Sequence, residues 1–231
     1  MISFVVPAYN EERYLPATLA AIHASARELG LDYEIVVADD GSTDGTARLA
    51  GEGGARVVGV QHRQISKTRN SGAREARGER LVFVDADTHV NAPLLAAAIA
   101  ALEGGAVGGG ARPGFAPEAP PWAHRLIRAV VGFMALFRWA AGCFIFARRD
   151  AFEAVGGFDE RHFAGEEIML SQALKGQGEF VILREGLITS PRKLMARGPW
   201  ETTWLVIRLL LRGMGGVRKR DHVHFWYDGK R

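Results

Sequence analysis

Cysteine is almost absent from the sequence. Cys143 is the single cysteine among 231 residues, so an intrachain disulfide is impossible and a cluster of thiolate metal ligands is excluded. A chain without disulfides is compatible with the reducing conditions of the cytosol. We therefore expect a cytoplasmic protein.

Long apolar runs are also missing. The two most apolar stretches, 129–137 and 139–147, are separated by Arg138, and each is far shorter than the roughly 20 residues that cross a bilayer. The amino-terminal MISFVVPAYNEER has no basic segment ahead of its apolar residues and soon reaches Glu11 and Glu12. It is therefore not typical of a secretory signal, and we expect neither a leader nor a membrane span.

Acidic residues become scarce towards the carboxyl end. The net charge is only +3, but residues 192–231 contain ten Lys or Arg and three acidic residues. Such a basic end suits an anionic partner, such as a phosphate-bearing ligand, a membrane surface or nucleic acid, and a solvated tail explains it equally well. Because no recognised nucleic-acid-binding module accompanies it, we expect no nucleic-acid partner.

What is present is the pattern of an α/β protein. A length of 231 residues with 48% hydrophobic and 24% charged residues is ordinary for one soluble domain. Near-continuous apolar runs at 2–8, 33–39, 55–61 and 80–86 predict strands, and segments 11–29, 42–51, 66–78 and 91–105 predict helices between and after them. This alternation predicts a mostly parallel, Rossmann-like sheet with helices on both faces.

The second half is less regular. Residues 110–121 are rich in Pro and Gly and predict a loop, and 122–142 predict a helix with aromatics among arginines. Residues 143–178 predict a strand, a short helix, a Gly-Gly turn and a helix that opens with Glu166 and Glu167, and 180–189 predict a strand or strand pair. We expect a single domain over 1–231.

Acidic side chains follow the predicted strands. The segments after the first, second and fourth strands carry Tyr9, Asn10 and Glu11, then Asp39 and Asp40, then Asp85 and Asp87. Because the carboxyl ends of parallel strands form the ligand-binding edge of an open sheet, these side chains are expected to converge there. Residues i and i+2 of an extended segment point to one side, so Asp85 and Asp87 can face a single Mg²⁺ or Mn²⁺. A polar loop after a strand is the alternative.

Five stretches in order now resemble the family 2 glycosyltransferases, which have the GT-A-type fold. They are VVPAYNEE, IVVADDGSTDGT, KTRNSGA, FVDADT and AVGGFDE…GEE, and the resemblance covers roughly residues 2–190. It implies transfer of a sugar from a nucleoside diphosphate donor, with UDP-sugars favoured, to an acceptor hydroxyl, with inversion and a divalent metal (Mn²⁺ or Mg²⁺). It also implies a nucleotide-sugar-binding half at 1–104 and an acceptor-side half at 105–190. Beyond the resemblance, the basic and partly apolar residues 191–231 predict an amphipathic helical extension.

The resemblance implies the donor-side roles. Asp87 is expected to bind the metal, and Asp85 to contact the metal, the sugar or the ribose. Asp40 is expected at a uracil-type imide, while Asp39 braces the loop or reaches the ribose. The remaining residues expected to line the donor site are Pro7, Tyr9, Glu11, Lys67 and Ala86. Glu11 could instead be a first-turn helix acid, and Lys67, preferred over Arg69, could be a solvated helix cation.

The acceptor side needs a base to take the proton of the attacking hydroxyl. Matching GEEIML to the family pattern implies Glu167 as this base, with Glu166 supporting it, although Glu stands where the family usually has Asp. Neighbouring helical residues lie about 100° apart, so only one of the two can point at the acceptor. Arg192, His222 or His224 could reach the diphosphate or the metal from a closing tail.

Two stretches mix apolar bulk with arginine, namely 122–139 and 200–216. This composition suits a helix lying in a membrane interface, and a buried helix with extended arginines explains it almost as well. We expect a saccharide or lipid-linked acceptor and peripheral contact with the inner face of the cell membrane. The rival functions are a sugar nucleotidyltransferase and a non-catalytic carbohydrate-binding or membrane-associated scaffold.

Overall fold

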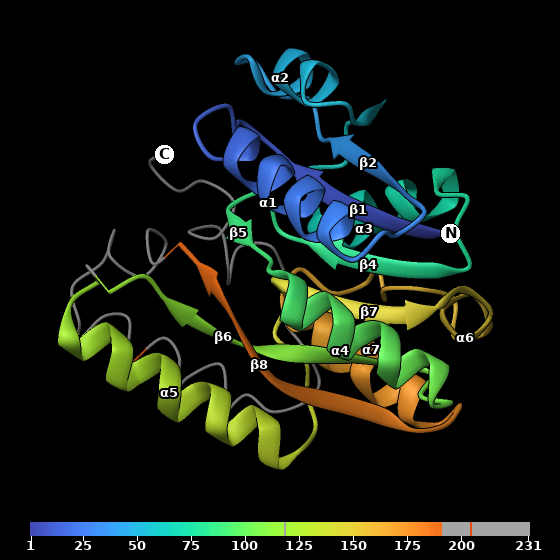
Figure 1. Cartoon of the computed structure of the whole chain (residues 1–231), viewed down its shortest axis with the longest axis vertical. Helices are drawn as coiled ribbons and strands as arrows, with labels where there is room; N and C mark the ends of the chain where they lie inside the picture. Colours follow the sequence, from blue (N-terminus) through green and yellow to red (C-terminus); the bar gives the residue numbers. More distant parts are fainter. Residues whose placement is uncertain (118, 191–203, 205–231) are drawn as a thin grey trace.

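The computed structural model describes residues 1–117, 119–190 and 204 (Figure 1). Most of the predicted extension at 191–231 therefore lies outside the described residues, together with Arg192, His222 and His224. Among the helices that are described, none is long and apolar enough to span a membrane.

The described strands form one mixed sheet of eight strands in the order β3-β2-β1-β4-β7-β6-β8-β5. In its first half, β1 (Ile2–Ala8), β2 (Tyr33–Asp39), β3 (Arg56–Gly59) and β4 (Arg80–Val84) pair in parallel. The helices that alternate with them are α1 (Leu15–Glu28), α2 (Thr46–Glu52), α3 (Ile65–Glu75) and α4 (Ala92–Glu103). The predicted α/β alternation is therefore confirmed.

The second half of the sheet is where the sequence prediction was wrong. Residues 110–121 were expected to form a loop, but β6 (Gly108–Phe115) pairs with β7 (Phe144–Arg148) and β8 (Phe180–Thr189). The glycines serve close packing here, because a Cβ at Gly109 would lie 2.3 Å from the carbonyl oxygen of Val181 and one at Gly110 would lie 2.4 Å from the Cβ of Ala140. The strand β7 is antiparallel to β4 and β6, and the short β5 (Thr88–His89) is antiparallel to β8.

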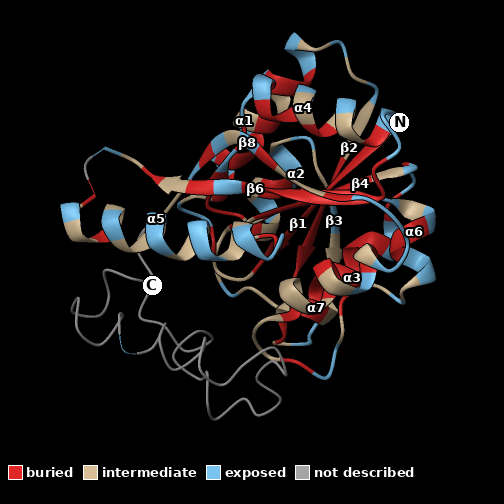
Figure 2. Cartoon of the chain, turned by 90° about the horizontal axis from the view of Figure 1, so that it is seen from below, coloured by how far each residue is buried: buried red, intermediate tan, exposed pale blue. Residues whose placement is uncertain are grey.

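Helices cover both faces of the sheet (Figure 2). Alternate side chains of β1 point to opposite faces, so Phe4 packs with α1 and α4, whereas Val5 packs with α3, α6 (Arg149–Ala154) and α7 (Glu166–Lys175). Helix α3 lies close to the sheet at Gly72, which has no Cβ. A Cβ at this position would lie 2.5 Å from Cγ1 of Val5. This close approach brings Arg69, three residues earlier on α3, to the carboxyl ends of the strands.

Helix α5 (Pro121–Leu136) lies outside this layered body, where it packs along β6 (Figure 1). It is shorter than the predicted 122–142, because Arg138 adopts a left-handed backbone conformation with φ of 51°. The chain then turns inward, and Trp139 and Ala140 are buried on the way to β7.

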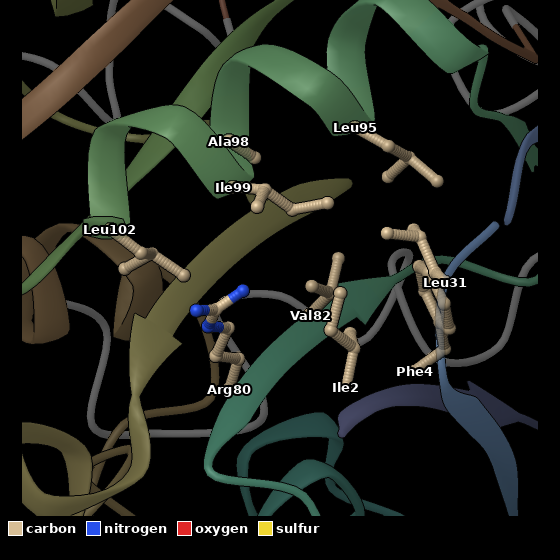
Figure 3. A pocket seen from close by; sticks show the side chains of 9 residues that line it. All are labelled: Ile2, Phe4, Leu31, Arg80, Val82, Leu95, Ala98, Ile99 and Leu102. Carbon is tan, nitrogen blue, oxygen red and sulfur yellow. The ribbon is translucent and has the colours of Figure 1, made fainter. Parts of the chain in front are cut away.

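A small apolar cavity lies beneath α4 (Figure 3). Ile2 and Arg80, the first residues of β1 and β4, line it together with Leu95 and Leu102 of α4. Its volume of about 10 Å³ is close to the minimum that holds one water molecule. It lies at the amino ends of the strands, opposite the predicted ligand-binding edge, and is too small for a substrate.

Candidate active site

A buried arginine joins the two acidic motifs at the carboxyl edge of the sheet. Arg69 is 1% exposed, and its Nη2 lies 2.8 Å from Oδ1 of Asp85 while its Nη1 lies 2.8 Å from Oε1 of Glu166. Nη2 also donates a hydrogen bond to the carbonyl oxygen of Gly142 at 2.8 Å. One guanidinium therefore holds together residues from α3, the segment after β4, the segment before β7 and the start of α7.

Of the two basic residues that the sequence offers on this helix, Arg69 lies in the acidic cluster, while a nucleotide-binding role for Lys67 stays a prediction. Lys67 is partly exposed and has no hydrogen-bond or ion-pair partner among the described residues. A usable signal was present in the sequence, because Arg69 shares one helical face with Gly72 and Ala73, three and four residues later. Small residues at that spacing indicate a face packed closely on the sheet, where an arginine must be paired with carboxylates.

The two glutamates differ in their surroundings. Glu166 is 4% exposed and ion-paired with Arg69, whereas Glu167 is half-buried. Burial, and then the negative charge of Glu166, raise the pKa of Glu167 to about 8. The Cδ of Glu167 lies 3.7 Å from where a Cβ at Gly142 would be, so this carboxyl group belongs to the same cluster. A raised pKa makes the ionised carboxylate a stronger base, so the fraction of Glu167 that is ionised can take a proton from an acceptor.

The carboxylate of Asp40 accepts four hydrogen bonds from residues 62–68. Its Oδ1 accepts hydrogen bonds from the backbone N–H groups of His62 and Arg63, at 2.5 and 2.9 Å. Its Oδ2 accepts from the N–H of Gln64 at 3.2 Å and from Oγ1 of Thr68 at 2.9 Å. A carboxylate offers about four acceptor positions, so Asp40 anchors the segment that enters α3 and has no acceptor left for the predicted imide.

Asp39 has the opposite environment. It is 7% exposed, and its Oδ2 accepts only a long hydrogen bond of 3.4 Å from the N–H of Ser42. Its Oδ1 is buried and has no hydrogen-bond partner among the described residues. Because a buried charged oxygen without a partner is costly, this atom is suited to accept a hydrogen bond from a ligand. The acceptor that the sequence reasoning assigned to Asp40 is therefore available on Asp39.

The loop after β1 is interlocked with the loop after β2. Asn10 has a left-handed φ of 52°, and its Oδ1 accepts from the N–H of Thr43 at 2.8 Å. The N–H of Glu11 donates to Oγ1 of Thr46 at 2.7 Å, and the N–H of Gly45 donates to Oε2 of Glu12 at 2.8 Å. The sequence GSTDGT thus fixes the position of the first loop.

The remaining expected donor residues divide into two groups. The ring of Tyr9 lies 3.8 Å from the guanidinium carbon of Arg63, and Glu11 is 6% exposed beside it in the same loop. Pro7 is buried within β1 opposite Ala38. Ala86 lies in the hydrophobic core, and its carbonyl accepts a hydrogen bond from Oγ1 of Thr18 at 2.8 Å. Tyr9 and Glu11 therefore lie in the loop after β1, whereas Pro7 and Ala86 are packed in the core, and the expected donor-side roles of all four stay predictions.

The segment after β4 fits a divalent cation that is shared with a ligand. Asp87 is 8% exposed, and the side chain of Asp85 is 20% exposed and uses only Oδ1 for Arg69. In the described ranges, no group of three or more His, Cys, Asp or Glu residues could hold a metal by itself. Mg²⁺ commonly binds one or two carboxylates plus phosphate oxygens and water, and the two aspartates match that partial donor set.

Comparison with known proteins identifies the family of this chain. The model described as glycosyl transferase family 2 matches residues 3–164. The chain is 37% identical over 98 residues to an undecaprenyl-phosphate 4-deoxy-4-formamido-L-arabinose transferase of Aeromonas hydrophila subsp. hydrophila, covering 38% of this chain and 29% of the relative. The corresponding protein of Pseudomonas aeruginosa is 39% identical over 98 residues, covering 38% and 28%. The chain thus covers less than a third of the length of these relatives.

Solved structures show the same fold at low sequence identity. Staphylococcus aureus TarS 1–349 in complex with UDP has a TM-score of 0.63 and 20% identity, covering 91% of this chain and 71% of that one. Glucosyl-3-phosphoglycerate synthase from Mycobacterium tuberculosis, with Mn²⁺, UDP and phosphoglyceric acid, gives 0.64 and 19%, covering 94% and 79%. The mannosyltransferase PcManGT from Pyrobaculum calidifontis, with GDP-Man and Mn²⁺, gives 0.63 and 20%, covering 98% and 68%.

Proposed function

Because the chain belongs to glycosyl transferase family 2, we propose that it transfers a sugar from a nucleoside diphosphate donor, with UDP-sugars favoured, to an acceptor hydroxyl. The observation that carries this proposal is the position of Arg69 between Asp85 and Glu166, 2.8 Å from each. The expected donor-side carboxylates and the expected acceptor-side carboxylates therefore lie around one buried cation. A scaffold that only bound carbohydrate would have no need for this arrangement.

On the donor side, Asp87 and Asp85 would hold Mn²⁺ or Mg²⁺ together with the diphosphate. Such a cation offsets the negative charge that develops on the leaving nucleoside diphosphate. Oδ1 of Asp39 accepts a hydrogen bond from the base or from a ribose hydroxyl, since it is the buried acceptor without a partner in the described chain. Tyr9 and Glu11 border the nucleoside from the interlocked loops.

On the acceptor side, Glu167 takes the proton of the attacking hydroxyl. The acceptor oxygen forms a bond to the anomeric carbon as the bond from that carbon to the diphosphate breaks, and the electron pair leaves with the diphosphate. A single displacement of this kind inverts the anomeric configuration. Glu166 is ion-paired with Arg69, and its charge contributes to the raised pKa of Glu167. The family match ends at residue 164, so this assignment depends on the geometry of α7.

The two possible classes of acceptor, a hydroxyl and a phosphate, differ in whether the reaction needs a base. The relatives' names specify undecaprenyl phosphate, and a phosphate monoester is already largely ionised at neutral pH because its second pKa is about 6. A hydroxyl, in contrast, must lose its proton to a base. The raised pKa of Glu167 favours a hydroxyl, carried on a saccharide or a lipid-linked saccharide. Undecaprenyl phosphate is the second candidate.

The test is a product assay with the full chain, Mn²⁺, UDP- or GDP-sugars and either acceptor class. We expect nucleotide release coupled to a glycosylated product with the anomeric configuration inverted, as read by mass spectrometry and NMR. Replacement of Glu167 by Gln should lower the rate of transfer to a hydroxyl by about 10²–10⁴-fold and leave transfer to a phosphate largely intact. Formation of a nucleotide-sugar from a sugar phosphate would instead indicate a nucleotidyltransferase, and no reaction with any donor would favour a non-catalytic scaffold.

A further inference from the structure

Helix α5 has one packed side and a long exposed side. Ala123 is fully buried beside Phe115 and Ala119 and is the buried residue within the helix. Much of the rest of the helix is exposed or only partly covered (Figure 2). An exposed helix of this length is normally polar on its outer side, so the chemistry of that side is informative.

The outer side of α5 is apolar at its carboxyl end. Phe133, Leu136 and Phe137 are 39%, 78% and 44% exposed, and we call these three residues the α5 apolar edge. At 100° per residue, Phe133 and Leu136 lie roughly 80° and 140° around the helix axis from Ala123. The α5 apolar edge is therefore distinct from the side that packs on β6. The ring of Phe137 also stacks on Trp139, with ring centroids 4.9 Å apart.

The charged residues of the segment that contains the α5 apolar edge have one sign. Residues 119–149 contain no Asp or Glu, whereas Arg125, Arg128 and Arg138 are exposed. From α7, Lys175 donates a hydrogen bond to the carbonyl oxygen of Phe137. Burial and the nearby charge of Arg138 lower the pKa of Lys175. Exposed aromatic and aliphatic residues bordered by arginines that form no ion pair with another described residue match an anionic lipid surface, where headgroup phosphates meet acyl chains.

The position of α5 connects this surface to the candidate active site. Leu136 and Gly142 are six residues apart, so they lie at most about 20 Å from each other. The carbonyl oxygen of Gly142 accepts a hydrogen bond from Arg69. A surface that contacts the α5 apolar edge would therefore lie near the cluster formed by Arg69, Asp85 and Glu166.

We propose that α5 docks in the plane of an anionic bilayer, with the α5 apolar edge inserted among the acyl chains and Arg125, Arg128 and Arg138 on the headgroup phosphates. This docking depends on α5 alone and does not require the proposed sugar transfer. Where the acceptor is lipid-linked, docking would present the site to the layer in which the acceptor is embedded.

The test uses the full chain and vesicles that contain phosphatidylglycerol in phosphatidylcholine, with pure phosphatidylcholine vesicles for comparison. We expect flotation with the anionic vesicles and weaker flotation as salt is raised. The double variant Phe133→Ser/Leu136→Ser should reduce partitioning at least 10-fold. The double variant Arg125→Gln/Arg128→Gln should reduce it about 30-fold, and only with anionic vesicles, because each arginine near such a surface contributes about 1 kcal/mol.

Matched controls are available at the β3 edge of the sheet, several strands away from α5. Val57 on the edge strand β3 is 37% exposed, and Arg48 on α2 is exposed, so Val57→Ser and Arg48→Gln should float like the wild type. Vesicle binding that survives both α5 double variants would overturn the proposal. Such a result would mean that the membrane contact lies elsewhere, for example in the basic residues 192–231, or that another copy of the chain covers the α5 apolar edge. UDP titration without lipid, which neither variant should change, separates failure of this proposal from failure of the proposed function.

Discussion

Arg69 and Glu166 are 97 residues apart in the sequence and form a buried ion pair at 2.8 Å. The same guanidinium binds Asp85 at 2.8 Å. One cation therefore fixes the relative position of α7, which carries the candidate base, and of the segment after β4, which carries the candidate metal ligands. This pairing makes the stability of the fold and the geometry of the site depend on the same residue.

Replacement of Arg69 by Met should be strongly destabilising. It leaves the buried Glu166 and the partly buried Asp85 without their cation, and loss of one partner of a buried pair costs about 3–5 kcal/mol of unfolding free energy. Urea denaturation of Arg69→Met beside the wild type measures this cost. Arg69→Lys should recover part of it, because one ammonium group keeps the charge but cannot reproduce the fork of a guanidinium.

Arg48→Met is the matched control for that change. Arg48 forms an exposed ion pair with Glu52 at 2.8 Å, and exposed pairs contribute about 0–1 kcal/mol. Equal unfolding free energies for Arg69→Met and Arg48→Met would show that Arg69 does not hold the cluster together.

Substitutions at Asp39 and Asp40 should affect different properties: nucleotide binding for Asp39 and the free energy of unfolding for Asp40. Asp40→Asn replaces two acceptor positions by an amide that faces N–H donors, so it should lower the unfolding free energy by about 2–3 kcal/mol. Asp39→Asn should leave that free energy unchanged or raise it, because Oδ1 of Asp39 is a buried charge without a partner in the described chain. The same variant should weaken nucleotide binding about 10-fold or more. Denaturation and calorimetry of both variants provide the readout, and the reverse pattern would restore Asp40 as the nucleotide-binding residue.

The rate of transfer to a hydroxyl should rise with pH. The pKa of Glu167 is raised to about 8 in the donor-free protein, and only the ionised carboxylate can take a proton. The value of kcat/KM should therefore increase between about pH 6 and 9 and level off above. Glu167→Gln should lower kcat by about 10²–10⁴-fold while leaving donor affinity intact, and Glu167→Asp should recover part of the rate. A pH profile that Glu167→Gln leaves unchanged in shape would exclude Glu167 as the base.

The raised pKa of Glu167 should also make the free energy of unfolding depend on pH, in the direction opposite to the rate. Between the ordinary glutamate pKa of 4.5 and the raised pKa of about 8, the folded protein retains a proton on Glu167 that the unfolded chain releases. The free energy of unfolding therefore falls as pH rises through this range. Urea denaturation at a series of pH values should show a flatter dependence for Glu167→Gln, whose amide does not titrate, and equal slopes would contradict the raised pKa.

Gly72 should be required for the close packing of α3. Gly72→Ala would put a Cβ 2.5 Å from Cγ1 of Val5, and such overpacking typically costs about 1–3 kcal/mol. Gly51 in α2 is a matched control, since a Cβ there meets no atom within 4 Å, and Gly51→Ala should stabilise by about 0.4–1 kcal/mol. Thermal denaturation distinguishes the two, and a harmless Gly72→Ala would mean that α3 lies further from the sheet than described.

The sequence predicted the parallel half of the sheet because its strands are continuous apolar runs separated by helix-like segments. It did not predict β6, because the prolines and glycines of residues 110–121 were taken as evidence of a loop. The strand also contains Gly109 and Gly110, where a Cβ would meet neighbouring atoms. Those glycines accommodate Val181 and Ala140, which are remote in sequence. Local composition does not distinguish a glycine needed for a turn from one needed for close packing.

The candidate site, too, could be predicted from local sequence only in part. The motifs located Asp85, Asp87, Glu166 and Glu167 but not the cation between them, since Arg69 acquires its partners only when α3 packs on the sheet. The choice between Asp39 and Asp40 likewise depends on which carboxylate meets the N–H groups of residues 62–64. Those hydrogen bonds join segments more than 20 residues apart, so the sequence pattern carries no direct sign of them.

The central claim is that Asp87 holds a divalent cation together with a nucleoside diphosphate. The most direct measurement is a calorimetric titration of UDP and GDP, with and without Mn²⁺, into the wild type, Asp87→Asn and the control Asp32→Asn, whose native side chain is 81% exposed. We expect one nucleotide to bind in a Mn²⁺-dependent manner to the wild type and to Asp32→Asn, and we expect Asp87→Asn to lose this dependence. Binding of neither nucleotide to a folded wild type, or equal Mn²⁺-dependent binding by Asp87→Asn, would contradict it.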